Sequence, residues 1–287
     1  MTTTYSHRFH AGNVGDVWKH TVLLAGLDAL TKDPSPFTVI DTHAGEGLYR
    51  LGSTGEWAEG TAKVLATRMS LPPALERFAH VQRGARSDMG PRRIYMGSPA
   101  LIAGALRDSD SAHLFELEPD TASTLQRRFA SDSRMTVHLG DGLSSLLPLI
   151  ENLPDRDRTL VFMDPAWETK AEWLEVPAAI GAAHRRRPGT RLVLWYPIKS
   201  YTRPNAMHMT LRRLGVPCTI MEVLTSPLEI RRNRLNGSGV LWVNPPGDIV
   251  GGLAEAAAVL GTICATHQQW WSTRLSGWQG DEISEGG

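Results

Sequence analysis

The chain is short of cysteines, carries no net charge and lacks a long apolar run, and each shortage argues against a class of protein. Cys218 and Cys264 are its only cysteines among 287 residues, and neither has a CxxC partner. This argues against a disulfide framework and a structural zinc site. The most apolar late segment, residues 251–265, contains Glu255 and is too short to cross a bilayer. The first residues are polar and do not resemble a signal peptide, so a cytoplasmic protein without a membrane role is expected.

The zero net charge gives no support for a polyanion partner. Lys and Arg total 30 and Asp and Glu total 30, so any contact with nucleic acid must come from local patches. Hydrophobic residues make up 41% of the chain, which is enough for a sizeable core. The length predicts one large α/β domain or two small ones.

Short apolar, β-branched runs alternate with longer helical patterns. The expected strands lie at residues 37–41, 112–116, 135–139, 159–164, 191–197, 218–223 and 239–244. The expected helices include residues 120–131, 142–152, 170–185 and 203–214. This order predicts an α/β fold with a mostly parallel, seven-stranded sheet covered on both faces. The short connection between the last two strands predicts an antiparallel hairpin.

One spacing departs from a simple strand–helix–strand unit. The first strand ends at Asp41 and the second at Glu116, with no strong strand pattern between them. Residues 53–95 are therefore expected to form a helical insertion within a single domain that spans residues 1–287.

Four expected strands end at or just before an acidic residue. In chain order these residues are Asp41, Glu116, Asp141 and Asp164. The carboxyl ends of parallel strands share one edge of a sheet, where ligands bind in such folds, so we expect the four side chains to gather there.

The first of these turns is rich in glycine. After Asp41 the sequence continues through His43 with Gly45 and Gly47, a D-x-H-x-G-x-G pattern. Glycines at a strand-to-helix turn allow close approach of a ligand, although they also serve ordinary tight turns. The pattern resembles the first motif of S-adenosylmethionine methyltransferases.

The next two turns suit other parts of a nucleotide-like ligand. Glu116 can accept from both ribose hydroxyls, with Glu118 and Asp120 as competitors for that role. Asp141, followed by Gly142, can accept from the exocyclic amine of an adenine, and it can equally cap the helix that follows.

The fourth turn reads Asp164-Pro165-Ala166-Trp167. It resembles the (D/N)-P-P-(Y/F/W) signature of methyltransferases that act on exocyclic nitrogens. The Asp164 carboxylate and the Pro165 carbonyl can each accept one N–H of an amine, which localises the nitrogen lone pair for direct in-line transfer. Trp167 offers a stacking face for an extruded base, although a core tryptophan after a turn is the alternative. No metal is needed.

The segment 5–21 holds an unusual density of polar residues. Metal binding by His7 and His10 is conceivable, but no further ligands accompany them. The other reading is a helix start capped by Asn13 or Asp16.

Together, residues 5–20, 41–53, 97–103, 116–119, 141–142, 164–168, 194–198 and 238–246 resemble the RlmJ family of adenine-N6 methyltransferases of 23S ribosomal RNA. The resemblance extends over nearly the whole chain and implies methylation of one adenine, at position 2030 in the family. It also implies S-adenosylmethionine as cofactor. The cofactor residues it implies are Lys19, His20, His43, Gly45, Ser98, Glu116, Asp141, Gly142 and Asp164.

The same resemblance assigns a catalytic role to Asp164, Pro165 and Trp167. Tyr5 and His7 would meet the substrate, 23S rRNA. The chain departs from the family at Ala166, where a second proline is usual, and at Trp167, where tyrosine is typical. A monomer is expected.

Arginine-rich segments are the candidates for phosphate contact. They lie at residues 185–191, 211–213 and 229–239. A solvated helix face explains the first two equally well, so the glycine-bearing third segment is favoured for RNA.

The sequence leaves two alternative functions open. A DNA adenine-N6 methyltransferase would use the same signature, but no target-recognition domain is evident. A non-catalytic RNA-binding protein that retains the cofactor is favoured only by Ala166.

Overall fold

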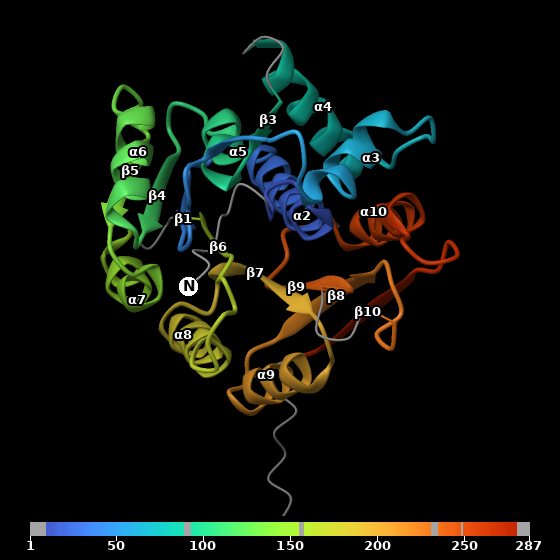
Figure 1. The fold of residues 1–287 in the computed structure, drawn as a ribbon. Coiled ribbons are helices and arrows are strands. Elements are labelled where there is room, and N and C mark those ends of the chain that lie inside the picture. Colours follow the sequence, from blue (N-terminus) through green and yellow to red (C-terminus); the bar gives the residue numbers. More distant parts are fainter. Residues whose placement is uncertain (1–9, 89–92, 155–157, 231–234, 248, 280–287) are drawn as a thin grey trace, which may run out of the picture.

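The computed structural model describes residues 10–88, 93–154, 158–230, 235–247 and 249–279. An eight-stranded sheet in the order β10-β8-β9-β7-β6-β1-β4-β5 crosses the molecule (Figure 1). Its strands are β1 (Phe37–Asp41), β4 (Ser111–Glu116), β5 (Met135–Leu139), β6 (Arg158–Met163), β7 (Arg191–Ile198), β8 (Cys218–Leu224), β9 (Gly237–Val243) and β10 (Ser272–Trp278).

The sheet combines a parallel part with an antiparallel part. β1, β4, β5, β6 and β7 pair in parallel, whereas β9 pairs antiparallel with β7 and β8, and β10 pairs antiparallel with β8. The seven expected strands and the antiparallel pairing of the last two are confirmed, with ends that differ by one or two residues. The expected strand number was wrong, because β10 adds an eighth.

β10 is an exposed edge strand with a polar sequence, which is why periodicity does not reveal it. Only tertiary contacts fix it. The Trp278 indole N–H donates to the Val216 carbonyl over 2.7 Å, and the Arg274 guanidinium lies 2.8 Å from the fully buried carboxylate of Glu222.

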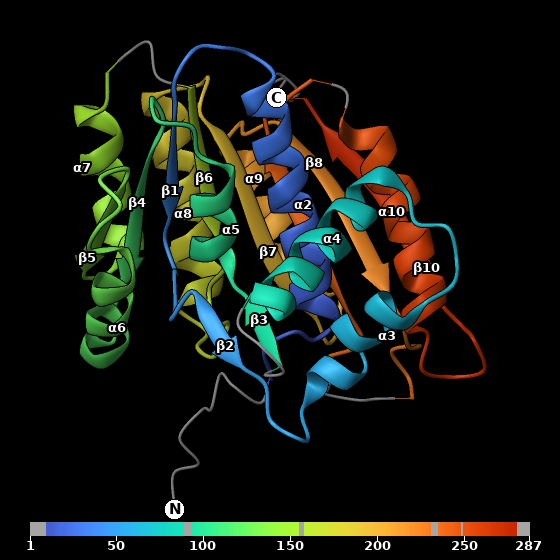
Figure 2. The same ribbon diagram turned by 90° about the horizontal axis from the view of Figure 1, so that it is seen from above.

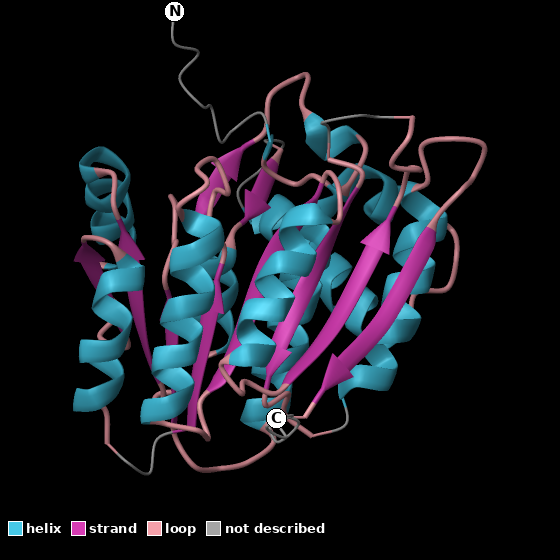
Figure 3. Cartoon of the chain, turned by 90° about the horizontal axis from the view of Figure 1, so that it is seen from below, coloured by secondary structure: helices cyan, strands magenta, loops and turns pink. Residues whose placement is uncertain are grey.

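Helices cover both faces of the sheet (Figures 1 and 3). One face carries α2 (Val14–Thr31), α5 (Ser98–Ala105), α6 (Pro119–Phe129) and α10 (Ile249–Cys264); the other carries α7 (Gly142–Asn152), α8 (Glu172–Arg186) and α9 (Thr202–Arg213). Successive strand residues enter the two cores in turn, as with Val39 and Ile40 in β1. This alternation explains why the parallel strands are continuously apolar.

The long connection from β1 to β4 forms its own small unit. It contains β2 (Leu48–Arg50), η1 (Glu56–Ala58), α3 (Thr61–Ala66), α4 (Pro73–Asp88) and β3 (Ile94–Met96). β2 and β3 form a two-stranded antiparallel sheet that the sequence did not predict. α4 packs on α2 and α10, at the side of the molecule away from the main sheet (Figure 2).

α2 is a central helix rather than a surface one. The Asn13 side chain caps it by accepting from the Asp16 backbone N–H over 2.9 Å, one of the two caps expected. Almost the whole helix is buried, including Asp16, Lys19 and His20. Charged side chains in such a position need partners, and those partners belong to the site.

Candidate active site

The acidic strand ends meet at one edge of the sheet, as the parallel order predicts. Cα pairing sets Asp41 beside Leu114 of β4 and beside Phe162 of β6. Glu116, Asp141 and Asp164 line a single cavity of about 420 Å³ at this edge. Asp41 is fully buried and does not line it.

All the residues expected to bind the cofactor line this same cavity, called here the cofactor cavity. They are Lys19, His20, His43, Gly45, Ser98, Glu116, Asp141, Gly142 and Asp164. Its volume falls within the range of roughly 300–1,000 Å³ that small-molecule sites occupy.

The glycine turn and Glu116 are tied to each other. Gly45 and Gly47 have φ values of 67° and 77°, in the left-handed region that favours glycine. The Gly45 N–H donates to Glu116 Oε2 over 2.8 Å, and the Glu118 N–H donates to Glu116 Oε1, also over 2.8 Å. The Glu116 carboxylate is therefore held at the wall of the cavity.

Asp141 serves as a helix cap and also faces the cavity. Its side chain accepts from the Leu143 backbone N–H over 2.9 Å at the start of α7. Beside it, a Cβ on Gly142 would lie 2.3 Å from the Thr42 carbonyl oxygen. Only glycine permits this approach between the turn after β1 and the start of α7.

Asp41 stabilises the glycine turn by accepting a backbone hydrogen bond. The His43 N–H donates to its Oδ1 over 3.2 Å. Complete burial raises the pKa of the Asp41 carboxyl to about 7, helped by the nearby charges of Asp164 and Glu116 and opposed by hydrogen bonds from Ser98 and His43.

Lys19 joins α2 to the turn after β6. Its ammonium lies 2.5 Å from Asp16 Oδ1 and 2.5 Å from Asp164 Oδ2, and all three side chains are largely buried. Burial alone would lower the pKa of Lys19, but the two carboxylates outweigh it and raise the pKa above its ordinary value. Lys19 therefore stays cationic through the neutral range. Asp16 is fixed in turn by the Gly12 N–H, 2.6 Å from its Oδ2.

A second side chain of α2 is anchored to the insertion. His20 Nδ1 shares a hydrogen bond of 2.5 Å with the Tyr95 hydroxyl of β3. Tyr95 and Tyr49 of β2 both line the cofactor cavity, so the small sheet forms one of its walls. Sequence reasoning missed these two tyrosines, because no strand pattern marks β2 or β3.

The turn from Asp164 to Trp167 is braced by α8. The Trp167 N–H donates to Glu172 Oε1 over 2.9 Å, and the Thr169 N–H donates to Glu172 Oε2 over 2.7 Å. Trp167 has a φ of 57°, and the residue is 5% exposed. The indole packs on Trp173 with 4.2 Å between ring centroids. The alternative prediction for Trp167, a core tryptophan that follows a turn, therefore describes how this side chain packs.

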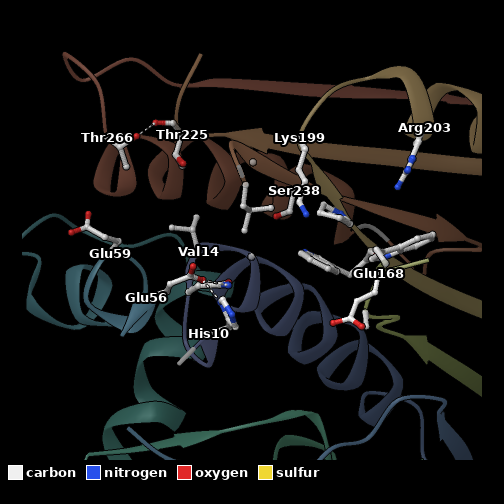
Figure 4. Close-up of a pocket in the computed structure, with 18 residues that line it drawn as sticks. His10, Val14, Glu56, Glu59, Glu168, Lys199, Arg203, Thr225, Ser238 and Thr266 are labelled. Carbon is white, nitrogen blue, oxygen red and sulfur yellow. Dashed lines mark hydrogen bonds and ion pairs between the residues drawn. The ribbon is translucent and has the colours of Figure 1, made fainter. Parts of the chain in front are cut away.

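A second cavity of about 750 Å³ adjoins the first, and it is called here the outer cavity (Figure 4). Both cavities are lined by His10, Asn13, Ala166 and Trp195. Asp164 and Pro165 line the cofactor cavity, Ala166 lines both, and Trp167 lines the outer one. The Asp-Pro-Ala-Trp turn therefore runs from one cavity to the next.

The N-terminal segment is held against the insertion at this junction. His10 Nδ1 lies 3.1 Å from Glu56 Oε2, and the Asn13 amide donates to the same oxygen over 3.1 Å (Figure 4). The Thr61 hydroxyl donates to the Gly12 carbonyl over 2.9 Å. Tyr5 and His7, expected to meet the substrate, lie outside the described residues, as does part of residues 229–239.

The two other arginine segments lie away from both cavities. α8 and α9 begin at the ligand edge of the sheet and run back along it, so residues 185–191 and 211–213 lie toward the opposite edge. Arg186, for example, pairs with Glu151 at 3.0 Å. Arg203, at the start of α9, lines the outer cavity instead, together with Lys199 (Figure 4).

Among the described residues, no helix has the length and apolar character to cross a bilayer. No cluster of three or more His, Cys, Asp or Glu side chains in those ranges is placed to hold a metal ion.

A mostly parallel sheet covered on both faces, with a glycine turn and acidic strand ends around one cavity, defines a Rossmann-like class I methyltransferase. Residues 34–274 match the family described as "Ribosomal RNA large subunit methyltransferase D, RlmJ", and the chain belongs to that family. It is accordingly an enzyme, a methyltransferase whose methyl donor is S-adenosylmethionine.

Relatives agree with this assignment. The chain is 34% identical over 248 residues to "Ribosomal RNA large subunit methyltransferase J" of Escherichia coli K12, covering 85% of this chain and 87% of that protein. It is 32% identical over 252 residues to the protein of that name from Haemophilus influenzae, with the same two coverages. The crystal structure of protein LPL1258 from Legionella pneumophila superposes with a TM-score of 0.85 at 28% identity, covering 94% of this chain and 98% of that one.

Proposed function

We propose that this protein transfers a methyl group from S-adenosylmethionine directly to the N6 amine of one adenine in 23S ribosomal RNA. One observation carries the proposal: the turn Asp164-Pro165-Ala166-Trp167 bridges two adjoining cavities, and Asp164 and Pro165 line the one that suits the cofactor. The names of the relatives from E. coli and H. influenzae support large-subunit ribosomal RNA as the substrate.

The residues around the cofactor cavity fit S-adenosylmethionine. The Glu116 carboxylate, fixed by Gly45 and Glu118, suits the two ribose hydroxyls. Asp141 suits an exocyclic amine, and the left-handed turn at Gly45 and Gly47 lets a ligand approach the backbone. When bound, S-adenosylmethionine supplies a methyl group on a sulfonium.

The chain's own contribution is to hold and polarise the amine. The N6 lone pair of adenine is delocalised into the ring and is a poor nucleophile. The Asp164 carboxylate and the Pro165 carbonyl each accept one N–H, which draws the nitrogen toward tetrahedral geometry and localises the lone pair. Lys19 keeps its charge, holds Asp164 by their 2.5 Å contact and so fixes the direction in which that carboxylate accepts.

Substrate capture would use cations near the outer cavity together with the N-terminal segment. Lys199 and Arg203 line that cavity and suit phosphate oxygens. Tyr5 and His7 remain proposed substrate contacts, and residues 229–239 a proposed phosphate contact.

The test is methyl transfer from tritiated S-adenosylmethionine to unmodified 23S rRNA, followed by mass analysis of the nucleosides. We expect N6-methyladenosine with the wild type and none with Asp164→Ala, while thermal unfolding shows that the fold of the variant persists. Methylated DNA in a parallel reaction without methylated rRNA would favour a DNA methyltransferase. Cofactor binding with no transfer to either would leave a non-catalytic RNA-binding protein.

A further inference from the structure

Two tryptophans line the outer cavity, and they differ in how much of the ring is free. The Trp167 ring is buried, packs on Trp173, and donates its indole N–H to the Trp195 carbonyl over 3.0 Å. A base could stack on it only after this packing is broken. Trp195 is partly exposed and lines both cavities.

The Trp195 ring is placed by packing from α2. A Cβ on Gly15 would lie 2.9 Å from Trp195 Cζ2, so the glycine leaves the room that the ring occupies. The Lys19 ammonium lies 5.0 Å from the ring centroid, within the range of a cation–π contact. The Lys19 ammonium therefore contacts both the Trp195 ring and the Asp164 carboxylate. The Lys19 side chain thereby links the ring to the proposed amine acceptor.

The indole N–H of Trp195 has no hydrogen-bond acceptor among the described residues, in contrast to that of Trp167. Packing rather than a hydrogen bond therefore sets the ring's position. Moving Trp167, by contrast, would break its bond to the Trp195 carbonyl and its contact with Trp173.

The rest of the outer cavity suits a nucleotide. Val14 and Pro197 give apolar wall, and the Ser238, Lys199 and Arg203 side chains reach it from the other side (Figure 4). Its volume of about 750 Å³ exceeds that of the cofactor cavity. Glu56, Glu59 and Glu168 also line the cavity, so an extruded adenosine would place its base against the apolar wall and its phosphate on the side of Lys199 and Arg203.

We propose that the outer cavity receives the target adenosine and that its base stacks on Trp195, not on the signature tryptophan Trp167. This inference rests on the proposed function and adds the residue that positions the substrate base. Trp167 then acts as a packed support beneath the turn, where its bond to the Trp195 carbonyl ties the Asp-Pro-Ala-Trp turn to β7.

The test compares Trp195→Leu, Trp195→Phe and Trp270→Leu. Trp270 is the matched control, because it is 38% exposed and lines neither cavity. We expect Trp195→Leu to lower kcat/KM for 23S rRNA by roughly 5- to 150-fold, the range that loss of base stacking gives. Trp195→Phe should recover most of the loss, and Trp270→Leu should match the wild type. Affinity for S-adenosylmethionine should be unchanged in all three.

A second readout does not depend on turnover. An RNA fragment carries 2-aminopurine in place of the adenine that the wild type methylates, and its fluorescence is measured in the complex. The probe should be quenched by the wild type and Trp195→Phe but bright with Trp195→Leu. Trp167→Leu removes the Trp167 ring and its bond to the Trp195 carbonyl, yet the bound probe should still be quenched, because the Trp195 ring remains.

The outcomes separate the two proposals. Wild-type protein that methylates no adenine would overturn the proposed function and this inference with it. Normal methylation by the wild type together with unchanged kcat/KM and quenching in Trp195→Leu would overturn the inference alone. Loss of quenching in Trp167→Leu but not in Trp195→Leu would return the stacking role to Trp167.

Discussion

The ammonium of Lys19 lies 2.5 Å from Asp164 Oδ2, joining the central helix α2 to the turn that holds the proposed amine acceptors. The same ammonium contacts Asp16 at 2.5 Å. Asp16, Lys19 and Asp164 form a largely buried ion-pair network in which one cation contacts two anions. Removing the cation leaves two carboxylates facing each other with little solvent.

Lys19→Met should therefore destabilise the protein by about 3–5 kcal/mol, the usual cost of breaking a buried pair from one side. Urea unfolding measures this. Adding Asp16→Asn to Lys19→Met should recover part of the loss, because one unpaired charge is removed. Lys63→Met is the control: its pair with Glu59 is more exposed and should be worth under about 1 kcal/mol. Equal losses in the two lysine variants would contradict the buried-network account.

Asp41 should make stability depend on pH in an unusual direction. Burial raises its pKa to about 7 from an ordinary value of 3.8, so the folded protein binds a proton that the unfolded chain has lost between those values. The stabilising contribution is complete below about pH 4 and is lost as the pH rises toward 7. Against Asp41→Asn, the wild type should lose up to about 1.4 kcal/mol for each pH unit in that window.

Urea unfolding of both proteins from pH 4 to pH 8 measures this difference. Asparagine keeps the size of the side chain and removes its titration. A difference between the two proteins that stays constant with pH would show that Asp41 does not take up a proton on folding.

Gly15→Ala should impair methyl transfer through the Trp195 ring. The added Cβ would meet Cζ2 at 2.9 Å, so the ring must move, although alanine itself favours a helix. We expect kcat/KM for rRNA to fall by about ten-fold or more, with cofactor affinity unchanged. Gly252→Ala in α10 is the matched control, because nothing lies within 4 Å of its added Cβ. It should be as active as the wild type and slightly more stable, by up to about 1 kcal/mol.

Gly142→Ala should damage the cofactor cavity itself. Its Cβ would lie 2.3 Å from the Thr42 carbonyl oxygen, a backbone atom that cannot rotate away. The turn after β1 and the start of α7 must then separate, and we expect cofactor affinity to fall by about ten-fold or more, measured by calorimetry. Gly104→Ala in α5, with open space around its Cβ, should bind the cofactor normally.

Arg274→Met should loosen the eighth strand. Glu222 is fully buried, accepts from the Tyr196 hydroxyl over 2.7 Å and pairs with Arg274 at 2.8 Å. Because Arg274 is partly exposed, we expect a loss of about 1–3 kcal/mol rather than the larger cost of a fully buried pair. The double variant Glu222→Gln with Arg274→Met should regain part of it. Unchanged stability in Arg274→Met would mean that β10 is held by backbone pairing and Trp278 alone.

The sequence by itself determined the parallel sheet and the place of the cofactor cavity. Continuous apolar strands bury both faces, and the chain reversal after each one brings Glu116, Asp141 and Asp164 to one edge. Caps are equally local, so Asn13 and Asp141 could be predicted from their position before a helix. Family resemblance added Lys19, His20, His43 and Ser98, which no local pattern marks.

Only the tertiary structure decided what depends on contacts between distant segments. β10 has no apolar alternation and exists because β8 offers a free edge, with Glu222 and Val216 as anchors for its side chains. Trp167 and Trp195 look alike in sequence, since each is an indole near the end of an apolar strand. Their difference arises from neighbours: Trp173 covers one ring, whereas the absent side chain of Gly15 leaves room for the other at the junction of two cavities. Exposure is a property of packing, and a linear pattern does not contain it.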